Sequence, residues 1–162
     1  MTWEPGRERV QRLIDEGELG VVPPDMKAAM RMLEDAERHL ATAATAKSTG
    51  DLAGAYQLAY DGLRKTAVSL LVAQGLRPTS RGGHVAVQEA VTAQFGTTVR
   101  VLRSFGRIRR ARNNFEYPSS ETPRPSADDV DDAIKVATDV RGAVTTIFKQ
   151  EILTPWQPAV GA

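Results

Sequence analysis

The stretch that decides the fold is Asp51–Gln74, DLAGAYQLAYDGLRKTAVSLLVAQ. Its apolar residues recur every three or four positions, which is the spacing of one face of an α-helix. Asp51 precedes the first apolar residue and is typical of an N-cap, and Gly75 follows the last one and ends the pattern. The stretch therefore predicts a long helix whose core face consists of Leu52, Ala55, Tyr56, Ala59, Leu63, Ala67, Leu70 and Leu71.

Proline and glycine divide the rest of the chain into further helical segments, and no segment predicts a β-sheet. Ser126 and Asp129 match a capping box with Asp in the place of Glu or Gln. These helices are expected over residues 7–19, 25–48, 84–95 and 97–117, and from Ser126 to shortly before Pro155. The expected core face of the 25–48 helix is Met26, Met30, Leu33, Leu40 and Ala44.

This helix order predicts an all-α fold, namely an antiparallel up-and-down four-helix bundle with an additional N-terminal helix. A length of 162 residues suits one domain. We expect an N-terminal helix and loop over 1–24, the bundle over 25–153, and a loosely ordered tail over 154–162.

Composition excludes several classes of function. With 21 Lys and Arg against 20 Asp and Glu, the total charge gives no warrant for binding nucleic acid or membranes. The absence of cysteine excludes disulfides, thiolate chemistry and zinc ribbons. Two histidines and no carboxylate cluster at ligand spacing predict no metal and no cofactor. No signal-peptide core and no membrane-spanning run is found, so the chain is expected to be cytoplasmic and free of membrane contact.

The strongest functional signal lies at residues 109–118, RRARNNFEYP. If the segment from Val99 is helical, Arg112 falls in the middle of an apolar stripe made of Val101, Phe105, Ile108 and Phe115. An unpaired buried charge is too costly, so Arg112 must be paired or must line a cleft that is not fully dry. Glu116, one turn later, offers an intrahelical ion pair, and an anion-binding cleft is the functional alternative.

Further candidates lie around this helix. Arg109 and Glu116 share one margin of the apolar stripe, and His84 opens a helix after two glycines. Asp61 lies near the core face of the 51–74 helix, where it can pair with Arg109 or Arg112 or orient one of them in a site. The solvent side of the arginine-rich helix is expected to carry Arg103, Arg107 and Arg110.

The helix order, the Gly82-Gly83-His84 connection and Arg112-Asn113-x-x-x-Tyr117 before a proline together resemble the HEPN (higher eukaryotes and prokaryotes nucleotide-binding) domain family, over roughly residues 26–150. The resemblance implies a helical bundle that forms a homodimer. It also implies one of two roles. Many members are metal-independent endoribonucleases of toxin–antitoxin, phage-defence or RNA-processing systems, and others are noncatalytic partners of nucleotidyltransferases.

The family's catalytic signature is an arginine, often followed by a polar residue, and a histidine four to six residues later. Arg112 and Asn113 match the first half, but Tyr117 stands where the histidine is expected. The resemblance thus implies Arg112, Asn113 and Tyr117 as the catalytic group. Arg109, Arg110 and His84 are then candidates for binding RNA phosphate, with Asp61 and Glu116 in structural or orienting roles.

Three hypotheses stay open. The chain is an RNA-directed, ribonuclease-like HEPN protein with a composite site in a dimer cleft, or a noncatalytic HEPN module that binds a partner protein such as a nucleotidyltransferase. In the third, it is a plain helical scaffold in which Arg112 and Glu116 form an interior ion pair. The missing histidine favours the second hypothesis, whereas the dense arginine face and Asn113 favour the first. An antitoxin or a nucleotidyltransferase encoded alongside would distinguish the first two.

Overall fold

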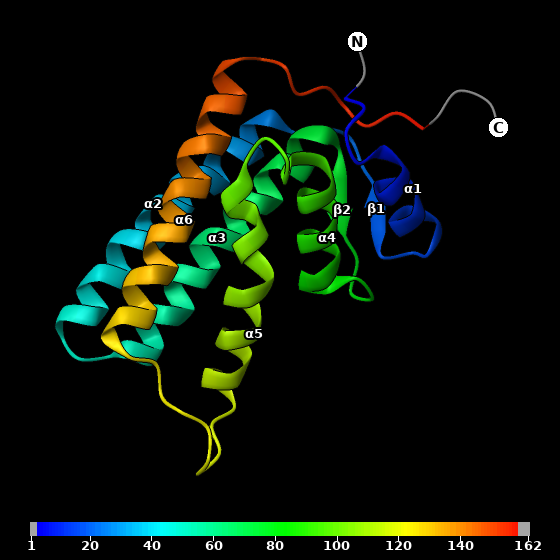
Figure 1. Ribbon diagram of the computed structural model, residues 1–162. Coiled ribbons are helices and arrows are strands. Elements are labelled where there is room, and N and C mark those ends of the chain that lie inside the picture. Colours follow the sequence, from blue (N-terminus) through cyan, green and yellow to red (C-terminus); the bar gives the residue numbers. More distant parts are fainter. Residues whose placement is uncertain (1–2, 159–162) are drawn as a thin grey trace.

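The computed structural model describes residues 3–158, with the long helix α3 (Leu52–Gln74) in contact with most of the other helices. α2 (Met26–Ser48) runs back along α3, and α6 (Ala127–Lys149) packs on both (Figure 1). As predicted, Asp51 caps α3 by accepting a hydrogen bond from the Gly54 N–H, and Gly75 ends it in the left-handed conformation. The capping box of Ser126 and Asp129 is confirmed at the start of α6.

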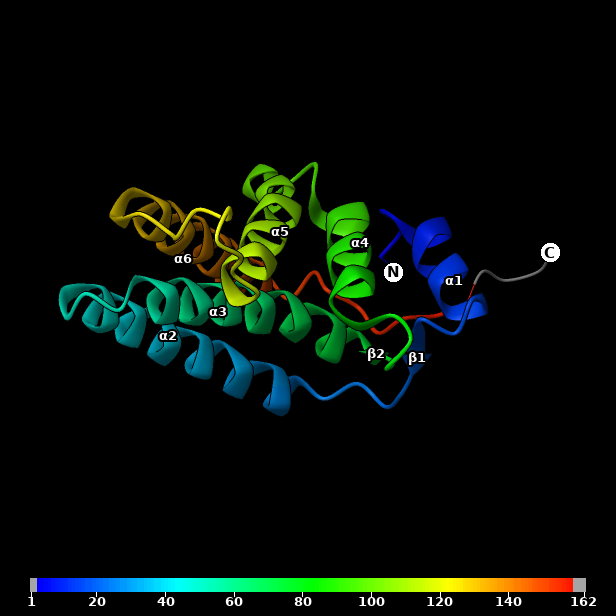
Figure 2. The ribbon, with the colours of Figure 1, turned by 90° about the horizontal axis from the view of Figure 1, so that it is seen from below.

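The shorter helices lie on the side of α3 that α2 leaves open. α4 and α5 both pack against α3, and α1 packs on α4 at the far end (Figure 2). The predicted all-α bundle with an additional N-terminal helix is confirmed. The bounds of these elements are α1 (Arg7–Asp15), α4 (Gly83–Phe95), the 3-10 helix η1 (Arg100–Ser104) and α5 (Phe105–Glu116).

The expectation that the chain contains no β-structure is wrong at one place. β1 (Leu19–Val21) and β2 (Leu76–Pro78) form a small antiparallel sheet in which Leu19 lies opposite Pro78 and Val21 opposite Leu76. Three-residue strands are too short to show an alternating pattern, and their pairing joins segments far apart in the chain. The sheet links the segment before α2 to the segment after α3.

The buried face of α2 differs from the predicted one. Met26, Met30 and Ala44 are exposed, whereas Leu33 and Leu40 are buried as expected. Alanines complete the buried face because small side chains let α2 approach α3 closely. At Gly62 of α3, an added Cβ would lie only 3.1 Å from the Leu40 side chain. The complete buried face is Ala29, Leu33, Ala36, Leu40 and Ala43.

The predicted continuous helix over 97–117 is also wrong in its first turn. Residues 100–104 form η1, and the α-helix begins only at Phe105. Since a 3-10 helix has about three residues per turn, the apolar positions before Phe105 change phase. Leu102 is therefore fully buried in the place expected for Val101, which is only half-buried.

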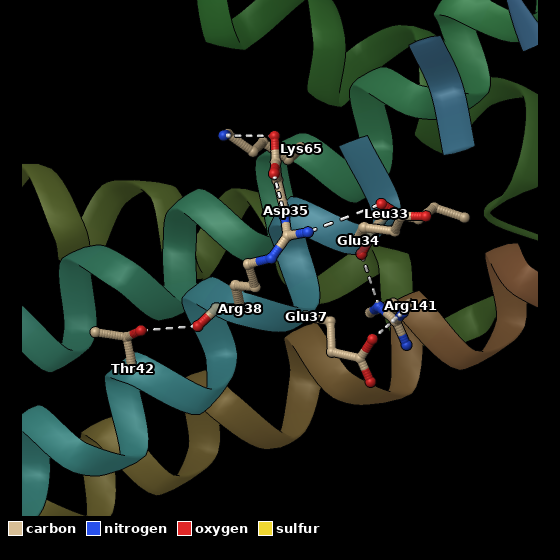
Figure 3. Close-up of polar contacts among 8 residues, drawn as sticks. All are labelled: Leu33, Glu34, Asp35, Glu37, Arg38, Thr42, Lys65 and Arg141. Carbon is tan, nitrogen blue, oxygen red and sulfur yellow. Dashed lines mark hydrogen bonds and ion pairs between the residues drawn. The ribbon is translucent and has the colours of Figure 1, made fainter. Parts of the chain in front are cut away.

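Polar side chains join α2 to its neighbours along their exposed edges (Figure 3). Arg141 of α6 donates to the Leu33 carbonyl at 3.0 Å and pairs with Glu37 at 3.0 Å. Lys65 of α3 pairs with Asp35 at 3.6 Å. Partly exposed ion pairs of this kind contribute little stability, so the apolar contacts hold the bundle and these pairs refine its alignment.

The segment after α6 returns toward the N-terminal end of the chain (Figure 1). The Trp156 N–H donates to the Gln74 carbonyl at 2.7 Å, and the Trp3 N–H donates to Thr154 Oγ1 at 2.8 Å. Thr154 and Trp156 of the expected tail make these contacts, and 159–162 lie outside the described residues. The division of the chain into 1–24, 25–153 and 154–162 stays a prediction. No helix within residues 3–158 is long and apolar enough to cross a membrane.

Candidate functional site

A cluster of polar side chains lies where α3, α4 and α5 meet, and we call it the Tyr60 cluster. Each helix contributes residues spaced three or four positions apart, so they project from a common face. Tyr60 is fully buried at the centre, with its ring edge-on to Phe105 at 6.2 Å. The cluster consists of Gln57, Tyr60, Asp61 and Arg64 from α3, His84 and Gln88 from α4, and Arg109 and Arg112 from α5.

Arg112 is held by four neighbours. Its Nε donates to Gln57 Oε1 at 2.7 Å, and its guanidinium carbon lies 5.5 Å from the centroid of the Tyr60 ring. One terminal nitrogen donates to Asn113 Oδ1 at 3.1 Å and forms the predicted ion pair with Glu116. The Arg112 side chain is 18% exposed and that of Glu116 is 39% exposed, so the pair lies at the surface and not in the interior.

Arg112 also lines a pocket, so the same residue both pairs with Glu116 and borders a cleft. The pocket has a volume of about 330 Å³ and is open to solvent. Its walls include Tyr56 and Gln57 of α3 and Phe115 and Glu116 of α5. An anion that entered this pocket would meet the guanidinium directly, in competition with the Glu116 carboxylate.

His84 is tied to the centre of the cluster. The Tyr60 hydroxyl and His84 Nδ1 lie 2.8 Å apart. Burial raises the pKa of Tyr60 to about 12, so the phenol stays protonated at neutral pH. Burial, followed by the positive charges of Arg64 and Arg112, lowers the pKa of His84 below its ordinary value. The imidazole is therefore neutral at neutral pH.

The remaining charged members are paired differently from the prediction. Asp61 does not pair with Arg109 or Arg112; its ion pair is with Arg64, at 3.8 Å. One turn of α3 separates Asp61 from Arg64, and this local partner is the one it meets. Arg109 instead donates through Nε to Gln88 Oε1 of α4 at 3.0 Å.

The predicted site residues thus fall into three groups. Arg112, Arg109, His84 and Asp61 belong to the Tyr60 cluster, and Asn113 and Glu116 contact Arg112 at the surface of α5, whereas Tyr117 and Arg110 lie apart from both. Tyr117 follows the last residue of α5 and is 76% exposed, and Arg110 faces solvent as expected. Tyr117 is the C-cap of α5 and has left the helical conformation, so helix spacing does not bring its exposed side chain back to the cluster.

Four members of the cluster, Gln57, Tyr60, Arg64 and Gln88, are not among the site residues expected from the sequence. The spacing of Gln57, Tyr60 and Arg64 on one helix face was a readable signal. Gln88 gave none, because its role depends on how α4 approaches α5. Within the described part of the chain, no group of three or more histidines and carboxylates could hold a metal ion.

The comparisons with known proteins bear on the region that contains this cluster. The HEPN domain family model matches residues 29–147, which is more than half of the chain and includes α3, α4 and α5. Neither a search of curated proteins nor a search of solved structures found a match. HEPN domains are generally ribonuclease-like or nucleotide-binding helical domains, and they commonly dimerise. The helical bundle and the family match agree, and this chain belongs to the HEPN domain family.

Proposed function

We propose that this chain is an RNA-directed, ribonuclease-like HEPN protein that acts as a homodimer in the cytoplasm, in a toxin–antitoxin or phage-defence type of system. The observation that carries the proposal is the convergence of three arginines, Arg64, Arg109 and Arg112, on a neutral histidine at one junction of helices. Asp61 and Glu116 offset two of these charges, and the positive excess that remains attracts phosphate even though the whole chain carries a net charge of only +1.

The proposed catalytic group is Arg112, Asn113 and Tyr117. The guanidinium of Arg112 borders an open pocket, and its acidic partner Glu116 is partly exposed. A phosphate can therefore exchange with that carboxylate without stranding it in a dry interior. Arginine suits this role because its planar fork binds phosphate through two hydrogen bonds at once.

A dimer supplies the additional polar groups that one copy lacks around a phosphate bound at Arg112. Asn113 and Tyr117 are exposed at the end of α5, so a second copy that packs there in a two-fold symmetric manner shares both residues with Arg112. Light scattering at tens of micromolar protein tests this step. A monomer at that concentration would remove the composite site, because one copy alone gathers too few polar groups around the phosphate.

The direct test is the affinity for a single-stranded RNA oligonucleotide, measured with matched arginine variants. Arg112→Ala and Arg109→Ala should each weaken binding about tenfold and lower the salt dependence by roughly 0.7 in log–log slope. Arg107→Ala is the control, because it removes the same charge from the opposite side of α5, where Arg107 pairs with Asp132 at 2.7 Å. Equal losses in all three variants would attribute binding to net charge and refute the assigned site.

A noncatalytic HEPN module with a nucleotidyltransferase or another partner encoded alongside is the second candidate. The observation that favours it is the engagement of Arg112 by Gln57, Asn113 and Glu116, together with Tyr117 at the place of the family's histidine. Incubation of the protein with RNA in excess chelator separates the candidates. Cleavage that depends on Arg112 supports the ribonuclease, and RNA that stays intact while a co-expressed nucleotidyltransferase co-purifies supports the module.

A further inference from the structure

The hydroxyl of Tyr60 determines which nitrogen of His84 carries the proton. Among residues 3–158, His84 Nδ1 is the hydrogen-bond partner of this hydroxyl, at 2.8 Å. If Nδ1 carried a proton and donated it, the phenol proton would lie in a buried place without an acceptor, which costs free energy. Tyr60 therefore donates to Nδ1. The neutral imidazole then carries its single proton on Nε2.

This arrangement makes His84 a hydrogen-bond donor and not a base. The lone pair of Nδ1 is occupied by Tyr60, and Nε2 bears hydrogen, so neither nitrogen is free to abstract a proton. Among the facing charges, Arg64 of α3 and Arg112 and Arg109 of α5 oppose protonation of the ring, and Asp61 of α3 favours it. Burial and these positive charges keep the ring neutral, and the hydrogen bond from Tyr60 keeps its proton on Nε2.

The neighbouring arginines retain donors for a ligand. Arg109 uses Nε for Gln88, and its two terminal nitrogens have no partner among residues 3–158. Arg64 meets Asp61 only at 3.8 Å, and its Nε is buried without a hydrogen-bond partner in the same range. An anion beside His84 thus finds a neutral donor and two guanidinium groups from three different helices.

We propose that Tyr60 is a positioning residue that holds His84 as an Nε2–H donor, and that this donor, with Arg64 and Arg109, binds a phosphate anion at the junction of α3, α4 and α5. The inference rests on the proposed RNA-directed function for the source of the phosphate. It gives Tyr60 a positioning role, assigns His84 and Arg64 as donors to the phosphate, and excludes His84 as a general base. A phosphodiester of RNA and a terminal phosphate monoester both offer the required oxygens.

The first test determines the tautomer by NMR of the imidazole nitrogens. His39→Gln on α2 leaves His84 as the only histidine of the chain and serves as the parent protein. We expect a single Nε2–H tautomer at neutral pH in this parent. Tyr60→Phe should populate both tautomers and move the pKa of His84 toward about 6.5. An Nδ1–H tautomer in the parent, or an unchanged tautomer and titration in Tyr60→Phe, would overturn the inference.

The second test titrates inorganic phosphate and follows the His84 imidazole signals or, in variants, the backbone amides of α4. His84→Gln keeps an N–H donor near the position of Nε2 but cannot titrate, whereas His84→Ala removes the donor. We expect binding within about threefold of the parent in His84→Gln and about tenfold weaker in His84→Ala. Equal losses in the two variants, or no loss in His84→Ala, would overturn the donor role. Thermal unfolding of each variant shows that the fold is retained.

RNA oligonucleotides with and without a 5′-phosphate separate the two sources of the anion. Equal competition by both against inorganic phosphate assigns the site to the phosphodiester, and competition only by the 5′-phosphorylated form assigns it to the monoester. RNA association that survives His84→Ala would overturn this inference while leaving the proposed function in place. Absence of RNA association, with the Nε2–H tautomer and phosphate binding intact, would refute the proposed function and support the site.

Discussion

Arg112→Ala removes two contacts that join α5 to α3 and also the contacts with Asn113 and Glu116 within α5. We expect it to lower the free energy of unfolding by about 2 kcal/mol. The hydrogen bond from Nε to Gln57 Oε1, 2.7 Å long, contributes about 0.5–1.5 kcal/mol. The ion pair with Glu116 spans one turn and is partly exposed, so it contributes about 0.3–0.5 kcal/mol. The stack on Tyr60, 5.5 Å from the ring centroid, contributes about 0.5–1 kcal/mol.

This loss is smaller than that expected for an interior ion pair. Breaking a buried pair costs about 3–5 kcal/mol, because the remaining charge is left in a dry place. Glu116 is 39% exposed, so its carboxylate regains water when Arg112 is removed. Equilibrium denaturation measures the difference, and a loss of about 2 kcal/mol corresponds to a melting temperature lower by roughly 4–8 °C in a domain of this size.

Two further variants show which contacts of Arg112 account for the loss of stability. Arg110→Ala removes an exposed arginine two positions earlier and should stay within about 0.5 kcal/mol of the parent. Arg112→Lys keeps a charge near Glu116 but has no counterpart of the Nε–H, so it should recover only part of the loss. A loss above about 4 kcal/mol in Arg112→Ala would show that the pair is interior and would restore the scaffold hypothesis. A loss no larger than that of Arg110→Ala would show that the contacts with Gln57 and Tyr60 are absent in solution.

Three other predictions follow from particular residues. Tyr117→His restores the family's arginine–histidine spacing and adds a base that titrates near pH 6.5, so cleavage of single-stranded RNA in excess chelator should appear or rise. Rapid cleavage by the wild-type protein that this variant slows would contradict the prediction that Tyr117 makes the motif degenerate. Gly75→Ala should destabilise the domain by at least about 2 kcal/mol in denaturant titrations, because Gly75 has a positive φ and its added Cβ would lie 2.5 Å from the Val22 carbonyl oxygen. Gly50→Ala, with a similar φ and nothing within 4 Å, should cost clearly less, and equal costs would refute the steric argument. Stability should fall above pH 10, because burial raises the pKa of Tyr56 and of Tyr60 to about 12 and the unfolded chain releases these protons first; Tyr60→Phe should reduce that fall, and an unchanged pH profile would contradict it.

Helix existence was predictable from the sequence because periodicity and caps are local properties. Asp51, Gly75 and the pair Ser126 and Asp129 mark their helix ends by hydrogen bonds within a few residues. Which residues of a helix point into the core was harder to predict. The shift from Val101 to Leu102 depends on a 3-10 turn that no local residue signals clearly.

Polar contacts between side chains were predictable only in part. The Arg112–Glu116 pair was foreseen because its members lie one turn apart. The partners Gln57 of Arg112 and Gln88 of Arg109 come from other helices, so no spacing along one helix predicts them. Asp61 shows the same limit, since its local partner Arg64 takes the place of the predicted distant one. Pairing within a helix follows from spacing, whereas pairing across helices requires the bundle geometry.

Tyr60 connects Arg112 of α5 with His84 of α4 through separate contacts of one side chain. Its ring face lies against Arg112, its ring meets Phe105 edge-on, and its hydroxyl holds His84. Phenylalanine at this position keeps the two ring contacts and removes only the hydroxyl. The stability of α5 on α3 and the orientation of His84 are therefore separable, although both depend on the same residue. This separation allows Tyr60→Phe to test the orientation of the histidine without disturbing the arginine that the proposed function requires.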